Sequence, residues 1–173
     1  GDRKIPAGRM GEARSEGITE NLVALGFKTM RLKTGTPPRV LRSSINWTQL
    51  KEEYGDEDPV PFSHFTENFK PNNDACHTIR TNDQCHNEIK KNLHRSPMYS
   101  GEIEAVGPRY CPSIEDKVKR FSEQPSHLLF LEPEWKNSDQ IYINGFSTSL
   151  PEDIQYKSLK LLPGFEKIEF LRP

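Results

Sequence analysis

The sequence has little apolar material and no long hydrophobic run. Apolar residues make up 33% of its 173 residues, and the mean hydropathy is -0.79. Both values are low for an autonomous globular enzyme, so we expect a modest hydrophobic core and much loop. No apolar run approaches the length of a membrane span, so we expect no membrane association.

Cysteine is also scarce. Three cysteines cannot all pair within one chain, which favours a reducing, cytoplasmic location over a disulfide-forming one. The chain opens at Gly1 without Met or an apolar leader and ends just after an apparent strand, so we interpret it as part of a longer protein. The net charge of -1 argues neither for nor against nucleic acid binding.

Several common site signatures are missing. The chain contains neither a G-x-x-x-x-G-K-[ST] loop nor a G-x-G-x-x-G turn, so it lacks the usual pyrophosphate-binding turns. No pair of carboxylates stands out, and a Ser-His-Asp triad cannot be recognised without geometry. Charge is nevertheless segregated, with a basic stretch at 31–42 and an acidic run at 52–58 that we interpret as solvated surface.

The apolar spacing predicts helices that do not alternate regularly with strands, so the expected fold class is α+β. We expect helices at about 15–25, 82–94, directly after Cys111, and 151–162. Three residue pairs resemble capping boxes: Thr81 with Gln84, Ser113 with Asp116, and Ser149 with Glu152. We expect strands at 28–33, 76–80, 102–106, 128–132, 140–143 and 167–171, and a long loop at 56–73.

The stretch GPRYCPSIEDKVKRF at 107–121 places a cysteine just before a helix start. Ile114, Val118 and Phe121 form an apolar stripe behind it, which supports the helix. The free N–H groups of the first turn and the neighbouring Arg109 both favour the thiolate form of Cys111. The alternative from the residues alone is a buried, inert thiol under a turn.

Two further patterns are weaker. Cys76-His77 and Cys85-His86 repeat a pair of potential zinc ligands, but their spacing matches no usual zinc framework. In RLKTGTPPRV, at 31–40, the hydroxyl groups of Thr34 and Thr36 and the amide of Gly35 are able to meet a phosphate or a flavin edge. A rigid, Pro-stiffened surface turn explains the same stretch.

Several stretches together resemble the GidA (MnmG) family of tRNA uridine 5-carboxymethylaminomethyl modification enzymes. They occur in that family's order over nearly the whole chain: AGRMGEARSEGITENL, RLKTGTPPRV, LHRSPMYSG, GPRYCPSIEDKVKRF, FLEPE, NGFSTSLPEDIQ and FLRP. The resemblance implies an FAD-dependent enzyme that uses NADH and methylenetetrahydrofolate. With an MnmE-type GTPase partner, it would install an aminomethyl-type group on C5 of the wobble uridine of tRNA. It also implies a homodimer of the full-length protein.

The resemblance also assigns residues. It makes Cys111 a catalytic cysteine and Ser15 a flavin contact. It places NAD binding on the stretch from Gly107 to Phe121, whose members are Gly107, Pro108, Arg109, Tyr110, Cys111, Pro112, Ser113, Ile114, Glu115, Asp116, Lys117, Val118, Lys119, Arg120 and Phe121. No metal site is expected.

The resemblance implies an inserted mixed α/β domain of a glutathione-reductase-like FAD enzyme with part of the flanking flavin domain. Its expected boundaries are 1–40 for the flanking flavin-domain segment, 41–150 for the inserted domain, and 151–173 for the return. Because the family's pyrophosphate turn is absent, we expect this chain alone not to retain FAD. Two alternatives stay open: a folate- and FAD-dependent tRNA uracil-5 methyltransferase relative, and a non-catalytic module that docks tRNA or a partner.

Overall fold

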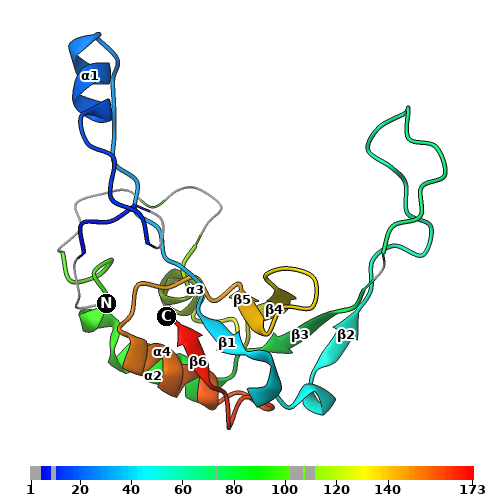
Figure 1. Cartoon of the computed structure of the whole chain (residues 1–173). Helices are drawn as coiled ribbons and strands as arrows, with labels where there is room; N and C mark the ends of the chain where they lie inside the picture. Colours follow the sequence, from blue (N-terminus) through cyan, green and yellow to red (C-terminus); the bar gives the residue numbers. More distant parts are fainter. Residues whose placement is uncertain (1–4, 9–10, 73, 102–106, 108–111) are drawn as a thin grey trace.

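An antiparallel sheet organises the fold, as seen in a computed structural model that describes residues 5–8, 11–72, 74–101, 107 and 112–173 (Figure 1). Its six strands lie in the order β2-β3-β4-β5-β1-β6. Their bounds are β1 Arg39–Leu41, β2 Lys51–Glu53, β3 Cys76–Arg80, β4 Leu128–Pro133, β5 Gln140–Asn144 and β6 Phe170–Arg172. The sheet mixes hairpin neighbours with distant segments, since β1 pairs with both β5 and β6.

The central strands alternate buried and exposed side chains, as expected for a sheet with one covered face. Leu129 and Leu131 of β4 are buried, and so are Ile141 and Ile143 of β5. Leu131 pairs directly with Ile143 across the ladder. These strands therefore supply the sheet side of the hydrophobic core.

Three helices complete that core: α2 Asp83–Lys91, α3 Ile114–Arg120 and α4 Glu152–Lys160. α2 packs against both α3 and α4, and each helix buries apolar residues. The shared core consists of Val40, Ile45, Ile79, Cys85, Ile89, Ile114, Val118, Leu129, Leu131, Ile141, Ile143, Phe146, Leu150, Ile154, Leu159, Leu162, Phe165 and Ile168. We call the sheet with these three helices the body.

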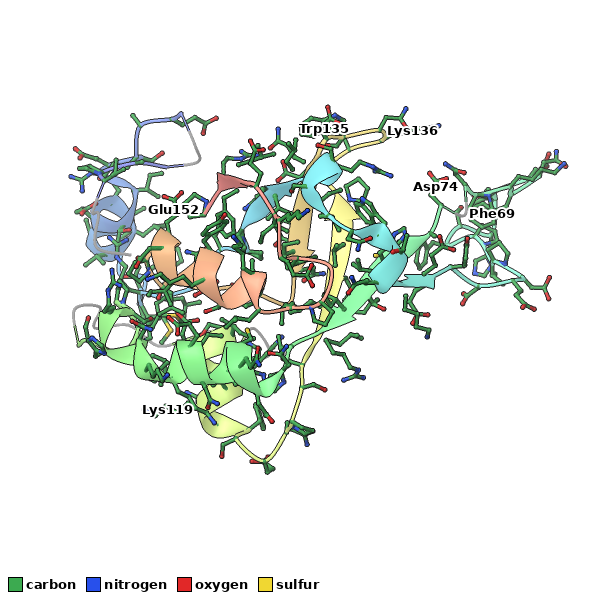
Figure 2. All side chains as sticks on the ribbon, turned by 90° about the horizontal axis from the view of Figure 1, so that it is seen from below. Phe69, Asp74, Lys119, Trp135, Lys136 and Glu152 are labelled. Atoms are coloured by element: carbon green, nitrogen blue, oxygen red, sulfur yellow. The ribbon has the colours of Figure 1, made fainter. Side chains whose placement is uncertain are left out.

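The N-terminal finger, residues 11–32, projects from the body and carries α1, Ile18–Ala24 (Figure 1). None of the residues of α1 is buried. A second projection, the arm at residues 54–74 without residue 73, extends between β2 and β3, and Figure 2 shows Phe69 and Asp74 on it. Phe62 and Phe65 on the arm are almost fully exposed.

Most expected elements are confirmed. All four helices form, and the strand at 76–80 has the expected bounds. The strands expected at 128–132 and 140–143 each extend one residue further, and 167–171 is a strand only from Phe170. The strand expected at 102–106 lies outside the described residues. The antiparallel sheet with separate helices agrees with the α+β expectation.

The strand expected at 28–33 is wrong. It alternates basic and apolar residues, but it belongs to the projecting finger, where Leu32 alone takes part in an isolated bridge. A short strand is stable only when it is hydrogen-bonded to neighbouring strands. The sheet instead contains Arg39–Leu41 and Lys51–Glu53. Neither three-residue strand has enough sequence to show a period of two.

Two of the three expected caps are also wrong. Asn82, not Thr81, caps α2, because its side chain accepts a hydrogen bond from the amide of Cys85. Pro151 precedes α4 without a side-chain cap. Ser113 does cap α3 as expected, since its Oγ accepts from the amide of Asp116 at 3.2 Å.

The expected domain boundaries at 40/41 and 150/151 stay predictions. The hydrophobic core includes residues on both sides of each boundary, namely Val40 and Ile45 around the first and Leu150 and Ile154 around the second.

Candidate functional site

Four of the sequence motifs meet around the first turn of α3. They contribute residues 33–37, 96–99, 113–120 and 145–150, and we call this meeting point the motif junction. None of these segments is adjacent to another in the sequence. Tertiary structure therefore collects stretches that sequence analysis treated separately.

The backbones of segments 33–37 and 145–150 approach each other closely. Thr36 and Thr148 exchange two backbone hydrogen bonds, of 3.0 and 3.2 Å. A Cβ atom on Gly35 would lie 2.5 Å from the backbone nitrogen of Thr148. The glycine of RLKTGTPPRV is thus needed because any side chain would push the two segments apart.

α3 is held against the fourth segment by two further bonds. The amide of Ile114 donates to the carbonyl of Ser147 at 2.7 Å. The ammonium group of Lys117 donates to the carbonyl of Gly145 at 2.9 Å. These bonds use one of the free N–H groups at the start of α3, which the helix itself leaves without a partner.

The side chain of Glu115 lies at the centre of the junction and is fully buried. Its Oε1 accepts hydrogen bonds from Ser96 Oγ at 3.0 Å, from the Ser149 amide at 3.0 Å and from Ser149 Oγ at 3.3 Å. The two serine hydroxyl groups are also 2.8 Å apart. One carboxylate oxygen therefore links three of the four segments.

A cluster of polar and charged side chains surrounds Asp116 and Tyr99. Tyr99 donates to Asp116 Oδ1 at 2.8 Å, and burial and this bond to a carboxylate raise the pKa of Tyr99. Lys119 Nζ lies 4.5 Å from the centre of the Tyr99 ring. Arg120 Nε lies 3.3 Å from Asp116 Oδ1. Lys33 joins the cluster by donating to the carbonyl of Met98 at 3.0 Å.

This cluster borders a small cavity of about 190 Å³. Its walls carry three cationic side chains and one carboxylate: Lys33, Lys119, Arg120 and Asp116. Figure 2 shows Lys119 at the end of α3, at the surface of the molecule. The excess of positive charge suits a small anionic group, such as a phosphate.

A larger cavity, of about 1080 Å³, opens next to the junction. Thr36, Thr148 and Ser149 line it, together with residues from the start of α4 and from the segment before β6. The Nε2 atom of the buried Gln155 donates to the carbonyl of Leu150 at 2.7 Å, which fixes the orientation of the amide. Gln155 Oε1 is left without a partner among the described residues.

The large cavity fits only part of an FAD molecule. Its apolar wall, its hydroxyl groups and the uncommitted Gln155 Oε1 suit a flat ring that carries N–H donors. Carboxylates outnumber cations in its lining, which disfavours a pyrophosphate: the charged lining residues are Glu152, Asp153, Glu169 and Lys167. Figure 2 shows Glu152 at the start of α4.

The sequence-predicted site residues fall into three groups. Pro108, Arg109, Tyr110 and Cys111 lie outside the described residues. Ser15 is exposed on the finger and lines neither cavity. The rest of the predicted NAD stretch is Gly107, at the small cavity, and the residues from Pro112 to Phe121, of which Ser113, Ile114, Glu115 and Val118 are buried and Lys119, Arg120 and Phe121 are exposed.

The two described cysteines are poor nucleophiles. Burial raises the pKa of Cys85 to about 12. Cys76 is half-buried, its thiol donates to the carbonyl of Leu131, and burial together with Glu132 raises its pKa. Within the described ranges, no group of three or more His, Cys, Asp or Glu side chains is arranged to hold a metal ion.

Sequence reasoning missed Ser96, Tyr99 and Gln155. The partners of Glu115 are 19 and 34 residues away along the chain. No periodicity links residues at such separations. Nothing in the stretch LHRSPMYSG itself marks Ser96 or Tyr99 as a partner of α3.

Comparison with known proteins gives concordant results. The profile of the family described as "Glucose inhibited division protein A" matches residues 1–173. The chain is 47% identical over 174 residues to the tRNA uridine 5-carboxymethylaminomethyl modification enzyme MnmG of Cytophaga hutchinsonii, and 46% identical over 172 residues to that of Rhodopirellula baltica. These alignments cover 100% and 99% of the chain, but 28% and 26% of the relatives.

The fold is similar to solved structures as well. Two crystal forms of Aquifex aeolicus GidA match with TM-scores of 0.86 and 0.83, at 42% and 39% identity. Each match covers 100% of the chain and 30% or 28% of the solved chain. The chain thus spans less than a third of the length of these relatives.

Among the described residues, no helix is long and apolar enough to cross a membrane.

Proposed function

Because the chain belongs to the glucose inhibited division protein A family, we propose that it is part of an enzyme that modifies the wobble uridine of tRNA in the cytoplasm. The full-length enzyme would act as a homodimer with an MnmE-type GTPase and would use FAD, NADH and methylenetetrahydrofolate. The observation that carries the proposal is the motif junction, which gathers four family motifs around the start of α3.

Cys111 is the proposed catalytic residue. It lies two positions before Ser113, whose side chain caps α3, and a thiol close to a helix start tends to ionise. A thiolate that adds to C6 of uracil makes C5 nucleophilic, so that C5 would form the bond to the incoming one-carbon group. C5 then loses its proton and the bond from sulfur to C6 breaks, which regenerates the thiolate. Because Cys76 and Cys85 have raised pKa values, Cys111 is the best candidate for this role.

The residues of the small cavity are proposed to hold a phosphate of the nicotinamide cofactor. Lys33, Lys119 and Arg120 supply the positive charge there. FAD would supply the redox chemistry, with its ring end against the larger cavity. Its pyrophosphate would be held by parts of the full-length protein outside this chain, because the rim of that cavity is acidic and the chain lacks a glycine-rich phosphate turn.

Replacement of the thiol tests the proposal directly. In the full-length enzyme, Cys111→Ala should abolish wobble-uridine modification, measured by mass spectrometry of tRNA nucleosides. Removal of a nucleophile typically lowers turnover by several powers of ten. Cys85→Ala is the matched control, and because its thiol is buried in the hydrophobic core, it should keep the activity of the folded fraction. Unchanged modification by Cys111→Ala would refute the role of Cys111.

A further inference from the structure

The burial of Glu115 is unusual for its residue type. Its side chain is completely inaccessible to solvent, although it sits in the first turn of a short helix beside the exposed end of the body. Transfer of a carboxylate from water to a protein interior costs free energy, and hydrogen bonds offset this cost only in part. An apolar side chain of similar volume would often stabilise a fold as well or better.

The hydrogen bonds of Glu115 are distributed asymmetrically. All three donors bind Oε1, whereas Oε2 is buried without a partner among the residues that the structure describes. A buried acceptor without a partner destabilises the folded state. The arrangement is therefore not one that maximises the stability of the carboxylate.

What the hydrogen bonds to Oε1 do determine is the position of α3 relative to Ser96 and Ser149. Through Ser149 it connects α3 to the wall of the large cavity, and through Ser96 it connects both to the turn after α2. The Ser149 amide is a backbone group, so this bond fixes the main chain itself and not only a rotatable side chain. A shift of α3 along its axis would break it.

We propose that Glu115 is a positioning residue for the reaction: it holds the first turn of α3, the helix that follows Cys111 in the sequence, in register with Ser149 at the wall of the large cavity. This inference rests on the proposed function, since Cys111, the proposed catalytic residue, stands three positions before Ile114, the first residue of α3, in the sequence. Reaction rates depend steeply on such placement, because an error of about 1 Å can cost about 100-fold.

The experiment uses the full-length enzyme and two replacements of Glu115. Glu115→Met removes the acceptor at similar volume and should lower kcat for tRNA modification by about 10- to 100-fold, with little change in KM for tRNA. Glu115→Gln keeps an oxygen where Oε1 lies and should recover most of kcat. Ser149→Ala removes one hydroxyl group but leaves the amide bond, so its kcat should fall between the two.

Two controls separate positioning from simple loss of stability. Glu123→Gln makes the same change on an exposed residue after α3 and should leave kcat unchanged. The rate of Cys111 alkylation with iodoacetamide, measured on the folded fraction, should change in Glu115→Met but not in Glu115→Gln. If Glu115→Met does not fold, Glu115→Gln should still keep most of kcat, and Ser149→Ala should have a lower kcat than Glu115→Gln.

The outcomes are distinguishable from failure of the proposed function. If Cys111→Ala abolishes modification while Glu115→Met and Ser149→Ala keep a normal kcat, the positioning role is wrong and the function stands. Equal loss of activity in Glu115→Gln and Glu115→Met would also overturn the positioning role, because the retained acceptor would then be irrelevant. If Cys111→Ala stays active, the proposed function itself fails.

Discussion

The body and the N-terminal finger both contain helices with an apolar stripe, but only the helices of the body bury that stripe. α2 in the body buries Cys85 and Ile89 against neighbouring elements. α1 in the finger has an apolar stripe that includes Ile18 and Leu22, yet these side chains are 61% and 39% exposed. An amphipathic pattern thus predicts a helix with an apolar face, but whether anything covers that face depends on the rest of the fold.

The two regions differ in what this chain itself places against their apolar faces. The chain spans about 28% of the length of the relatives that it matches, so much of the full-length protein lies outside it. Apolar surface of the finger, including Phe27 and Met30, is consequently available to those parts. The body, by contrast, contains both sides of its own core.

The largest expected effect on stability comes from replacing phenylalanine by alanine at one buried and one exposed position. Phe146 is fully buried in the body, whereas Phe27 is 61% exposed in the finger. In this chain, Phe146→Ala should lower the free energy of unfolding by about 3–5 kcal/mol, and Phe27→Ala should change it by less than about 0.5 kcal/mol. Urea unfolding followed by the fluorescence of Trp47, which packs against the core, measures both. Similar losses in the two variants would show that the finger shares the core.

A second pair of substitutions compares glycines. Gly35→Ala places a Cβ 2.5 Å from the backbone of Thr148 and should destabilise the body by about 1–3 kcal/mol. Gly26→Ala forces a φ of +85° on alanine, but in open space and within the finger. Its strain of about 1–2 kcal/mol should therefore not reach the body.

Hydrogen exchange of the Thr148 amide distinguishes the effects of the two glycine substitutions. Protection of this amide, which donates to the carbonyl of Thr36, should fall in Gly35→Ala and stay unchanged in Gly26→Ala. Equal protection in both variants would mean that the approach of the two segments tolerates a side chain.

The smallest expected effect is a pH dependence confined to the body. His86 and His127 stack 5.2 Å apart, and Thr81 bonds to both, through the His86 ring and the His127 amide. Burial lowers the pKa of both imidazoles from the ordinary value of 6.5. At His86 the charge of Lys90 adds to the lowering of the pKa and that of Asp83 opposes it. At His127 the charges of His86 and Lys117 add to the lowering, while a hydrogen bond with the backbone of Lys117 opposes it.

The direction follows from proton binding. Below pH 6.5 the unfolded chain takes up protons that the folded histidines resist, so the free energy of unfolding should fall as pH drops toward their lowered pKa values. His127→Gln should make this fall shallower than in the parent chain. Urea titrations at several pH values check the slope, and His64→Gln on the exposed arm is the matched control. An identical slope in His127→Gln would exclude the pair as its source.

Local patterns determined much of the fold. The stripe of Ile114 and Val118 and the Ser113 cap predicted α3 correctly, because helix formation depends on residues three and four apart. The strands β3 to β5 were also predictable from their apolar runs. β1 and β2 were not, since each exists only through pairing with distant strands.

The same division applies to the candidate site. The sequence alone determined the family and the helix that follows Cys111, because these depend on residue identity and short-range geometry. Only the tertiary structure decided that Gly35 faces Thr148 and that Glu115 binds Ser96 and Ser149. Those contacts join residues 19 to 113 positions apart, and the chain brings such residues together only after the core of the body has formed.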